Sequence, residues 1–375
     1  MTPRAVLAAL AAWLVGIELL ATPARLAIRR VRKHHGPAAE PQIRELAALQ
    51  HAARRNPPAR WAYRERIRAL EATLRPTERR RRVLPVLARI ALSIALCALT
   101  LSFAVLFTNT RPPRFGSPMT PHQLGMDYSE LEIMTDDGVR LAAWHIPGDD
   151  GAPVVVLLHG LGTARADMLG AAAALHEAGF HCLLPDFRAH GDSGGAFTSF
   201  GHLERRDAEA AYTRARRLPG ADGSRMGVYG FSMGGSVALM TAGGRAGVGA
   251  VVAEAPYDTL ARAVGHYGRL LYRLPPKAGA PLFWLPYAAM FRTKLGDVAP
   301  VNRIGAIEAS VMLVGSDDDP LVAPGTLQNL AGAAAGAAVY DAPGMGHMTE
   351  EISAGYFDRI VQFFEEALGE EPHHP

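Results

Sequence analysis

Apolar residues follow two different patterns along the chain, and the change falls near residue 107. In the first pattern, residues 83–107 are apolar with one charge, Arg89, near the start. A helix over these residues spans about 37 Å, more than the roughly 30 Å hydrocarbon core of a bilayer. The pattern therefore predicts a membrane-spanning helix, with the Arg89 side chain reaching toward the near interface.

A second apolar run at 5–21 is shorter and contains Glu18. It predicts a second membrane span, with an interfacial helix or a signal peptide as the alternatives. A signal peptide fits less well because its charged leading region would hold only Arg4. Residues 1–107 are together predicted to form an N-terminal membrane region.

The predicted basic loop at 22–82, between the two runs, carries 17 Lys or Arg and 5 Asp or Glu. Basic loops of this length tend to stay cytoplasmic. This predicts an inner-membrane or plasma-membrane protein whose remaining chain lies on the outer, periplasmic side. The helical pattern at 60–74 indicates a helix that lies on anionic headgroups or packs on a partner. No nucleic acid is expected, because no known binding module is present.

After a Pro-rich stretch, which predicts a linker over 108–127, a second pattern begins. Short apolar runs alternate with helical segments, and the run 152–160 is apolar on both faces, as a central parallel strand requires. This predicts an α/β fold: a mostly parallel central sheet with helices on both faces, preceded by N-terminal transmembrane helices. The predicted strands are 130–135, 139–147, 180–187, 225–230, 249–256, 309–317 and 337–343, and the predicted helices are 166–178, 202–218, 233–243 and 350–368.

One long segment, about 260–300, interrupts this alternation. It is rich in proline and in Tyr, Phe and Trp. Excursions of this length in a compact domain are usually functional, so the segment predicts a short lid. The catalytic domain is predicted to span 128–369, with a tail at 370–375.

Composition and charge refine this organisation. The chain is 49% hydrophobic and 20% charged, which predicts a mostly globular protein. The net charge of +3 divides into +13 for residues 1–107 (19 basic, 6 acidic) and −10 for residues 108–375 (20 basic, 30 acidic). The two cysteines, Cys97 and Cys182, lie in an apolar run and a buried strand, so no disulfide is expected. The sequence has no zinc-type spacing, and no metal is predicted.

Ser232 lies where a predicted buried strand ends and a helix begins, inside the stretch "GVYGFSMGG". A sharp turn there strains the serine backbone, and side chains at positions 230 and 234 would clash within the turn. The turn raises the hydroxyl above the sheet at a helix N-terminus, where developing negative charge is favoured. A hydroxyl in such a place needs a nearby base to act as a nucleophile.

Five motifs together resemble the α/β-hydrolase superfamily, over about residues 128–369. "GFSMGG" resembles its nucleophile elbow, "VVVLLHGLG" its oxyanion strand and turn, "DFRAHGDSGG" a common loop, "MLVGSDDDPLV" its acid turn and "PGMGHMTE" its histidine turn. Their order is that of the superfamily. Within it, the chain looks most like a short-lid, membrane-anchored group related to serine aminopeptidases and to acyl-protein or lysophospholipid hydrolases.

The resemblance implies a catalytic triad. Ser232 would be the nucleophile and His347 the base, with an Asp orienting the imidazole. Asp317, Asp318 and Asp319 stand in a row. The family pattern places the acid three residues before a Val, which favours Asp319, whereas counting three residues from the preceding Gly favours Asp318.

The resemblance further implies an oxyanion hole made by the backbone N–H groups of Leu161 and Met233. It implies no cofactor. Four polar residues beside these motifs are interpreted as structural supports: His159, Asp186, Arg188 and His190. In the lid, His266 and Tyr267 are candidates for substrate contact, with core or surface roles as the alternative.

The sequence thus predicts a membrane-anchored serine hydrolase that cleaves acyl ester or thioester bonds through an acyl-enzyme intermediate. Its expected partners are a small acyl or lipid-like substrate and membrane lipid. A serine aminopeptidase-like peptidase is the first alternative, but it needs carboxylates near the lid, where only Asp258 and Asp297 stand at the two ends. A non-catalytic scaffold is the second, and it fits poorly because no triad residue is missing.

Overall fold

The computed structural model describes residues 40–55, 60–114, 119–243, 247–273, 275–316, 318–342, 346–347 and 355–369. The chain divides into two compact units, Met1–Thr100 and Leu101–Pro375. The predicted span at 5–21 and the tail at 370–375 lie outside the described residues.

Helices make up the described part of the first unit. Helix α2 (Glu40–Arg55) is followed by helix α3 (Arg60–Asn109), whose first turns pair with α2. Arg66 of α3 forms an ion pair with Glu45 of α2 at 2.7 Å. The segment predicted as a basic loop is therefore helical where it is described, because its Ala, Leu, Glu, Gln and Arg residues all favour helix. The predicted helix at 60–74 packs on α2 of its own chain.

The second half of α3 is long and apolar enough to cross a membrane by length and composition. This segment is Pro85–Asn109, and only 11% of its most apolar stretch is buried inside the protein. Exposed side chains along it include Leu87, Ile94 and Leu101. The core helix of a soluble protein would instead be mostly buried.

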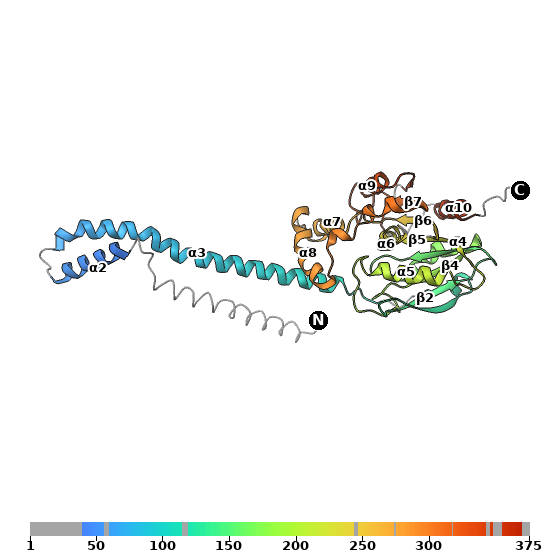
Figure 1. The fold of residues 1–375 in the computed structure, drawn as a ribbon, viewed down its shortest axis with the longest axis horizontal. Coiled ribbons are helices and arrows are strands. Elements are labelled where there is room, and N and C mark those ends of the chain that lie inside the picture. Colours follow the sequence, from blue (N-terminus) through green and yellow to red (C-terminus); the bar gives the residue numbers. More distant parts are fainter. Residues whose placement is uncertain are drawn as a thin grey trace. The chain divides into compact units, whose positions relative to one another are not determined.

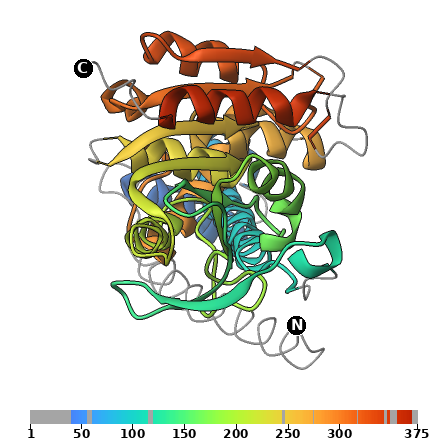
Figure 2. The same cartoon turned by 90° about the vertical axis from the view of Figure 1, so that its right-hand side faces the viewer.

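An eight-stranded mixed sheet forms the centre of the second unit, in the order β1-β2-β4-β3-β5-β6-β7-β8. Strand β2 runs antiparallel to both β1 and β4, and all other neighbours are parallel. Figure 2 shows the teal β1–β2 hairpin at one edge and the orange and red strands at the other. The strands are β1 Ser129–Met134, β2 Arg140–Ile146, β3 Pro153–Leu158, β4 His181–Pro185, β5 Asp222–Phe231, β6 Val248–Glu254, β7 Ser310–Gly315 and β8 Ala338–Asp341.

Helices cover both faces of this sheet (Figure 1). Along β3, Val154, Val156 and Leu158 pack in one buried cluster, while Val155 and Leu157 pack in the other. The first cluster includes residues of α5 (Glu204–Ala215) and α6 (Met233–Ala242), and the second includes residues of α4 (Leu169–Glu177) and α10 (Tyr356–Leu368). The strand is apolar on both sides because both sides are buried, as predicted.

Two helices form the predicted lid region: α7 (Leu260–Tyr272) and α8 (Pro276–Phe291). The Thr259 side chain accepts from the amide of Arg262 and caps α7, and α8 begins with a proline at its first position. Short 3₁₀ turns then lead back to β7, which helix α9 (Thr326–Ala333) follows.

The predicted linker begins as a segment packed against the body. Leu106, at the end of α3, is fully buried in the first cluster. The amide of Thr198 donates to the carbonyl of Thr110 at 2.9 Å, and the Arg114 guanidinium donates to the carbonyl of Ser193. Residues 110–114 are therefore held by the 193–198 loop. The hydropathy of residues 108–121 did not indicate this contact.

Candidate active site

Ser232 occupies a strained turn between β5 and α6. Its backbone has φ 54° and ψ −115°, a conformation that is costly for a residue with a side chain. A Cβ on Gly230 would lie 2.4 Å from the carbonyl oxygen of Gly234, and one on Gly234 would lie 2.1 Å from that of Leu158. The glycines are required because backbone atoms fill the space that side chains would take.

The hydroxyl of Ser232 points to an imidazole. Its Oγ lies 3.0 Å from Nε2 of His347, whose Nδ1 lies 2.6 Å from Oδ2 of Asp319. A carboxylate only accepts, so Nδ1 carries the proton and donates it, which leaves Nε2 to accept from the serine. Ser232, His347 and Asp319 are thus connected by two hydrogen bonds, an arrangement in which an imidazole can take the proton of a serine hydroxyl.

The structure distinguishes between the neighbouring aspartates. Asp319 is buried and faces His347, while Asp318 is exposed. Oδ1 of Asp319 also accepts from the amides of Leu321 and Val322, at 2.8 and 3.3 Å. The carboxylate is therefore held in place by its own loop. Asp317 lies outside the described residues.

The two residues predicted to form an oxyanion hole, Leu161 and Met233, both lie close to Ser232 in the chain fold. Met233 is the first residue of α6, where helix amides lack a partner within the helix. Leu161 lies in the turn after β3, and a Cβ on the preceding Gly160 would lie 3.4 Å from that of Ser232. The 160–162 turn is thus beside the serine.

His159 and His190 support this turn from below. His159 is fully buried, accepts from the amide of Phe187 at 2.9 Å and donates to the carbonyl of Gly160 at 2.7 Å. Burial lowers the pKa of His159 well below its ordinary value, so the ring is neutral. Nε2 of His190 accepts from the amide of Gly162 at 3.1 Å.

Two buried ion pairs anchor the loop that follows β4. Asp186 accepts from the Arg165 guanidinium at 2.8 Å, and Arg188 pairs with Asp207 at 2.6 Å. All four side chains are 5% exposed or less. These contacts agree with the structural interpretation of Asp186 and Arg188.

Sequence reasoning missed Glu254, at the end of β6. Its main-chain carbonyl accepts from the amide of Ser232 at 2.7 Å, which fixes the strained turn. Its carboxylate accepts from the hydroxyl of Tyr229, and burial raises the pKa of this carboxyl. The available signal was an acidic residue at the end of an apolar strand, a position where an unpaired charge is costly.

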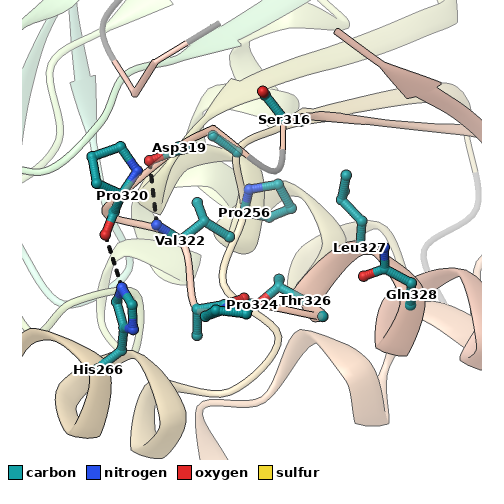
Figure 3. A pocket seen from close by; sticks show the side chains of 14 residues that line it. Pro256, His266, Ser316, Asp319, Pro320, Val322, Pro324, Thr326, Leu327 and Gln328 are labelled. Carbon is teal, nitrogen blue, oxygen red and sulfur yellow. Dashed lines mark hydrogen bonds between the residues drawn. The ribbon is translucent and has the colours of Figure 1, made fainter. Parts of the chain in front are cut away.

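Helix α7 contacts the loop that carries the acid. Nε2 of His266 donates to the carbonyl of Pro320 at 2.8 Å, and the Arg262 guanidinium donates to that of Pro324 at 2.8 Å. Tyr267 lies near enough that the Asp319 charge, after burial, raises the pKa of its phenol. His266, a candidate for substrate contact, is thus bonded to the protein itself (Figure 3).

A pocket of about 400 Å³ opens on this side of the acid (Figure 3). Its wall includes Asp319, His266 and Pro320, together with the first residues of α9. Ser232 and His347 do not line it. The pocket therefore adjoins Asp319 and helix α7.

The described part of the chain contains no cluster of metal-ligand side chains. No group of three His, Cys, Asp or Glu side chains there could hold an ion. Cys97 and Cys182 are both free thiols.

Comparisons with known proteins agree with this fold. The model of the alpha/beta hydrolase family matches residues 155–354. An uncharacterized protein of Mycobacterium tuberculosis is 30% identical over 301 residues, 77% of this chain and 97% of the relative. A solved esterase of Pyrococcus furiosus is 26% identical with a TM-score of 0.58, covering 69% of this chain and 98% of the esterase. A thiohydrolase of Aspergillus aculeatus is 31% identical over 124 residues, 32% of this chain and 39% of the thiohydrolase.

Proposed function

We propose that this chain, which belongs to the alpha/beta hydrolase family, is a membrane-anchored serine hydrolase that cleaves acyl ester or thioester bonds. The observation that carries the proposal is the pair of hydrogen bonds from Ser232 through His347 to Asp319. We assign Ser232 as nucleophile, His347 as general base and then acid, and Asp319 as the group that orients the imidazole.

The reaction follows from these positions. Oγ of Ser232 attacks the acyl carbonyl carbon while its proton passes to Nε2 of His347. The N–H groups of Leu161 and Met233 stabilise the oxyanion, an effect worth about 3 kcal/mol for each donor. The leaving alcohol or thiol takes the proton, and an acyl-enzyme remains. Water then attacks the acyl carbon and gives a proton to His347, which returns it to Oγ of Ser232 as the acid is released.

Ester and thioester substrates are favoured by two further observations. The solved esterase and the thiohydrolase have names that state these activities. The lid is apolar and aromatic, and residues 260–296 contain no Asp or Glu. We therefore propose a substrate with an apolar acyl group.

The composition of the lid also weakens the peptidase alternative. A lid that binds a substrate amine needs a carboxylate, and Asp258 is buried, where it pairs with Arg262 and accepts from Asn329. Aminoacyl amides should accordingly be turned over far more slowly than acyl esters of similar size.

Membrane anchoring is proposed from the Pro85–Asn109 segment of α3. The excess of basic residues over 22–82 supports a cytoplasmic location for that region and an outer location for the hydrolase. A reporter fused at residue 375 tests the orientation: activity of a periplasm-specific reporter is expected, and activity of a cytoplasm-specific reporter alone would reverse it.

The central experiment is labelling of the membrane-bound protein by a fluorophosphonate, which reacts with activated serines. Labelling of the native protein is expected, with none in Ser232→Ala and strong loss in His347→Ala. Absence of labelling in native protein that is well folded would contradict the proposal. Labelled protein is then assayed on acyl esters and thioesters of increasing chain length.

A further inference from the structure

The lid exposes large apolar side chains. Leu270 and Leu271, near the end of α7, are 44% and 61% exposed, and Trp284 and Leu285 of α8 are 46% and 53% exposed. These four residues are called the lid patch. The two helices that carry them contact each other, and an exposed apolar surface of this kind usually marks a place that binds something.

The charge within the lid segment has one sign. Residues 260–296 contain six Lys or Arg and no Asp or Glu, although residues 108–375 carry a net charge of −10. Arg269 and Arg273 flank the two leucines, and both are exposed. An apolar surface with Trp and basic residues matches the interface of an anionic bilayer, where Trp and Lys or Arg are favoured.

The position of the lid gives the third observation. The hydroxyl of Tyr287, in α8, donates to the carbonyl of Ser199 at 2.8 Å. In the same short loop, the amide of Thr198 donates to the carbonyl of Thr110, one residue after α3 ends. Leu106 and Tyr287 also belong to one buried cluster. The loop therefore holds α8 and the exit of the apolar helix together.

We propose that the lid patch docks on an anionic phospholipid surface, the same bilayer in which α3 is anchored. The inference rests on the membrane-anchor part of the proposed function. A segment that leaves the bilayer at residue 109 brings α8 to the interface, because both are bonded to residues 198–199. The lid then faces lipid, and the substrates it admits are acyl esters presented from the membrane.

Site-specific fluorescence tests the docking without depending on catalysis. The full chain with Cys97→Ala retains only the buried Cys182, so an added cysteine can be labelled with an environment-sensitive fluorophore. One label is placed by Leu285→Cys in the lid patch. Val339→Cys, on the edge strand β8 and 48% exposed, is the matched control, and Ile94→Cys reports on α3 itself. Each variant is reconstituted in vesicles of phosphatidylcholine with 30% phosphatidylglycerol.

Lipids with a quencher near the headgroup should lower the fluorescence at position 285 at least twofold and leave position 339 unchanged. Quenchers deep in the acyl chains should act at position 94. Replacing phosphatidylglycerol by phosphatidylcholine, or adding Arg269→Glu with Arg273→Glu, should reduce the quenching at 285 but not at 94.

Equal quenching at 285 and 339 with normal quenching at 94 would overturn the docking and leave the anchor intact. No quenching at 94 would reject the anchor and the docking together. The proposed serine hydrolase activity is tested separately, by fluorophosphonate labelling. Quenching of 285 by the label of a second copy, independent of lipid composition, would assign the lid patch to a dimer and also overturn the proposal.

Discussion

Nδ1 of His347 lies 2.6 Å from Oδ2 of Asp319, and the pair connects two segments that are 28 residues apart in the chain. The other oxygen of the carboxylate is occupied by two amides of its own loop. The carboxylate is therefore held in one orientation. It selects the imidazole tautomer that carries its proton on Nδ1.

Asp319→Asn is expected to lower kcat for ester hydrolysis by about 10³- to 10⁴-fold, because the amide can donate to Nδ1 and favour the wrong tautomer. Asp318→Asn is the matched control and should remain within about twofold of the native rate, because Asp318 is exposed. Steady-state kinetics on one ester measures both. If kcat falls strongly in Asp318→Asn and stays at the native value in Asp319→Asn, the assignment is reversed.

Gly234→Ala is expected to destabilise the turn by more than about 3 kcal/mol and to remove fluorophosphonate labelling, because its Cβ would overlap the carbonyl of Leu158. Gly332→Ala, in α9, has no atom within 4 Å of its new Cβ and should gain ~0.5 kcal/mol. Thermal melting in detergent measures the two changes. Similar melting temperatures for both variants would show that the turn can adapt.

His266→Ala is expected to lower kcat/KM about 3- to 10-fold, the value of one ordinary hydrogen bond. The carbonyl of Pro320 loses its donor, and the loop that carries Asp319 becomes less constrained. His266→Gln offers an amide donor and should recover most of the activity. If both variants are equally impaired, His266 contacts the substrate instead of the loop.

A pH effect on stability is expected at the buried pair of His145 and His181. Nε2 of His145 lies 3.2 Å from Nδ1 of His181, and burial, followed by the charges of His181 and Arg214, lowers the pKa of His145 to about 4. In the unfolded chain this pKa is about 6.5. Between these values the unfolded state binds more protons, so the stabilising contribution is complete above pH 6.5 and is lost as the pH falls toward 4.

Melting temperatures of native protein and His145→Gln, compared at pH 7 and pH 4.5, measure this effect. The glutamine keeps a donor for His181 but does not titrate. The fall in melting temperature on acidification should be smaller in the variant. An identical fall in both proteins would show that His145 does not contribute to acid sensitivity.

The central strands of the sheet were predictable because they are buried on both faces, which gives continuous apolar runs with unambiguous positions. The helix predicted at 233–243 is Met233–Ala242, and the one at 202–218 is Glu204–Ala215. The ends are shorter because terminal residues form turns that periodicity does not mark. Ser232, His347 and Asp319 were brought together by motif order, a signal that composition alone does not contain.

Other features could not be read from the sequence. Helix α7 has a clear helical period, but α8 is almost uniformly apolar, so the pattern does not show where α8 begins and ends. Arg114 and Thr110 bind the 193–198 loop through backbone carbonyls, for which no residue pattern exists. Glu254 supports Ser232 through its main chain, a role that almost any residue type can fill.

The chain order of the three proposed active-site residues has a consequence for biosynthesis. Ser232 is translated 115 residues before His347, and the strained turn that presents it is complete once β5, α6 and β6 have folded. A growing chain therefore carries its serine without a base for about 6 to 23 seconds, at synthesis rates of about 5–20 residues per second. On the proposed mechanism, the enzyme is inert on the ribosome and becomes reactive only when the histidine turn is made, after the apolar helix has already emerged.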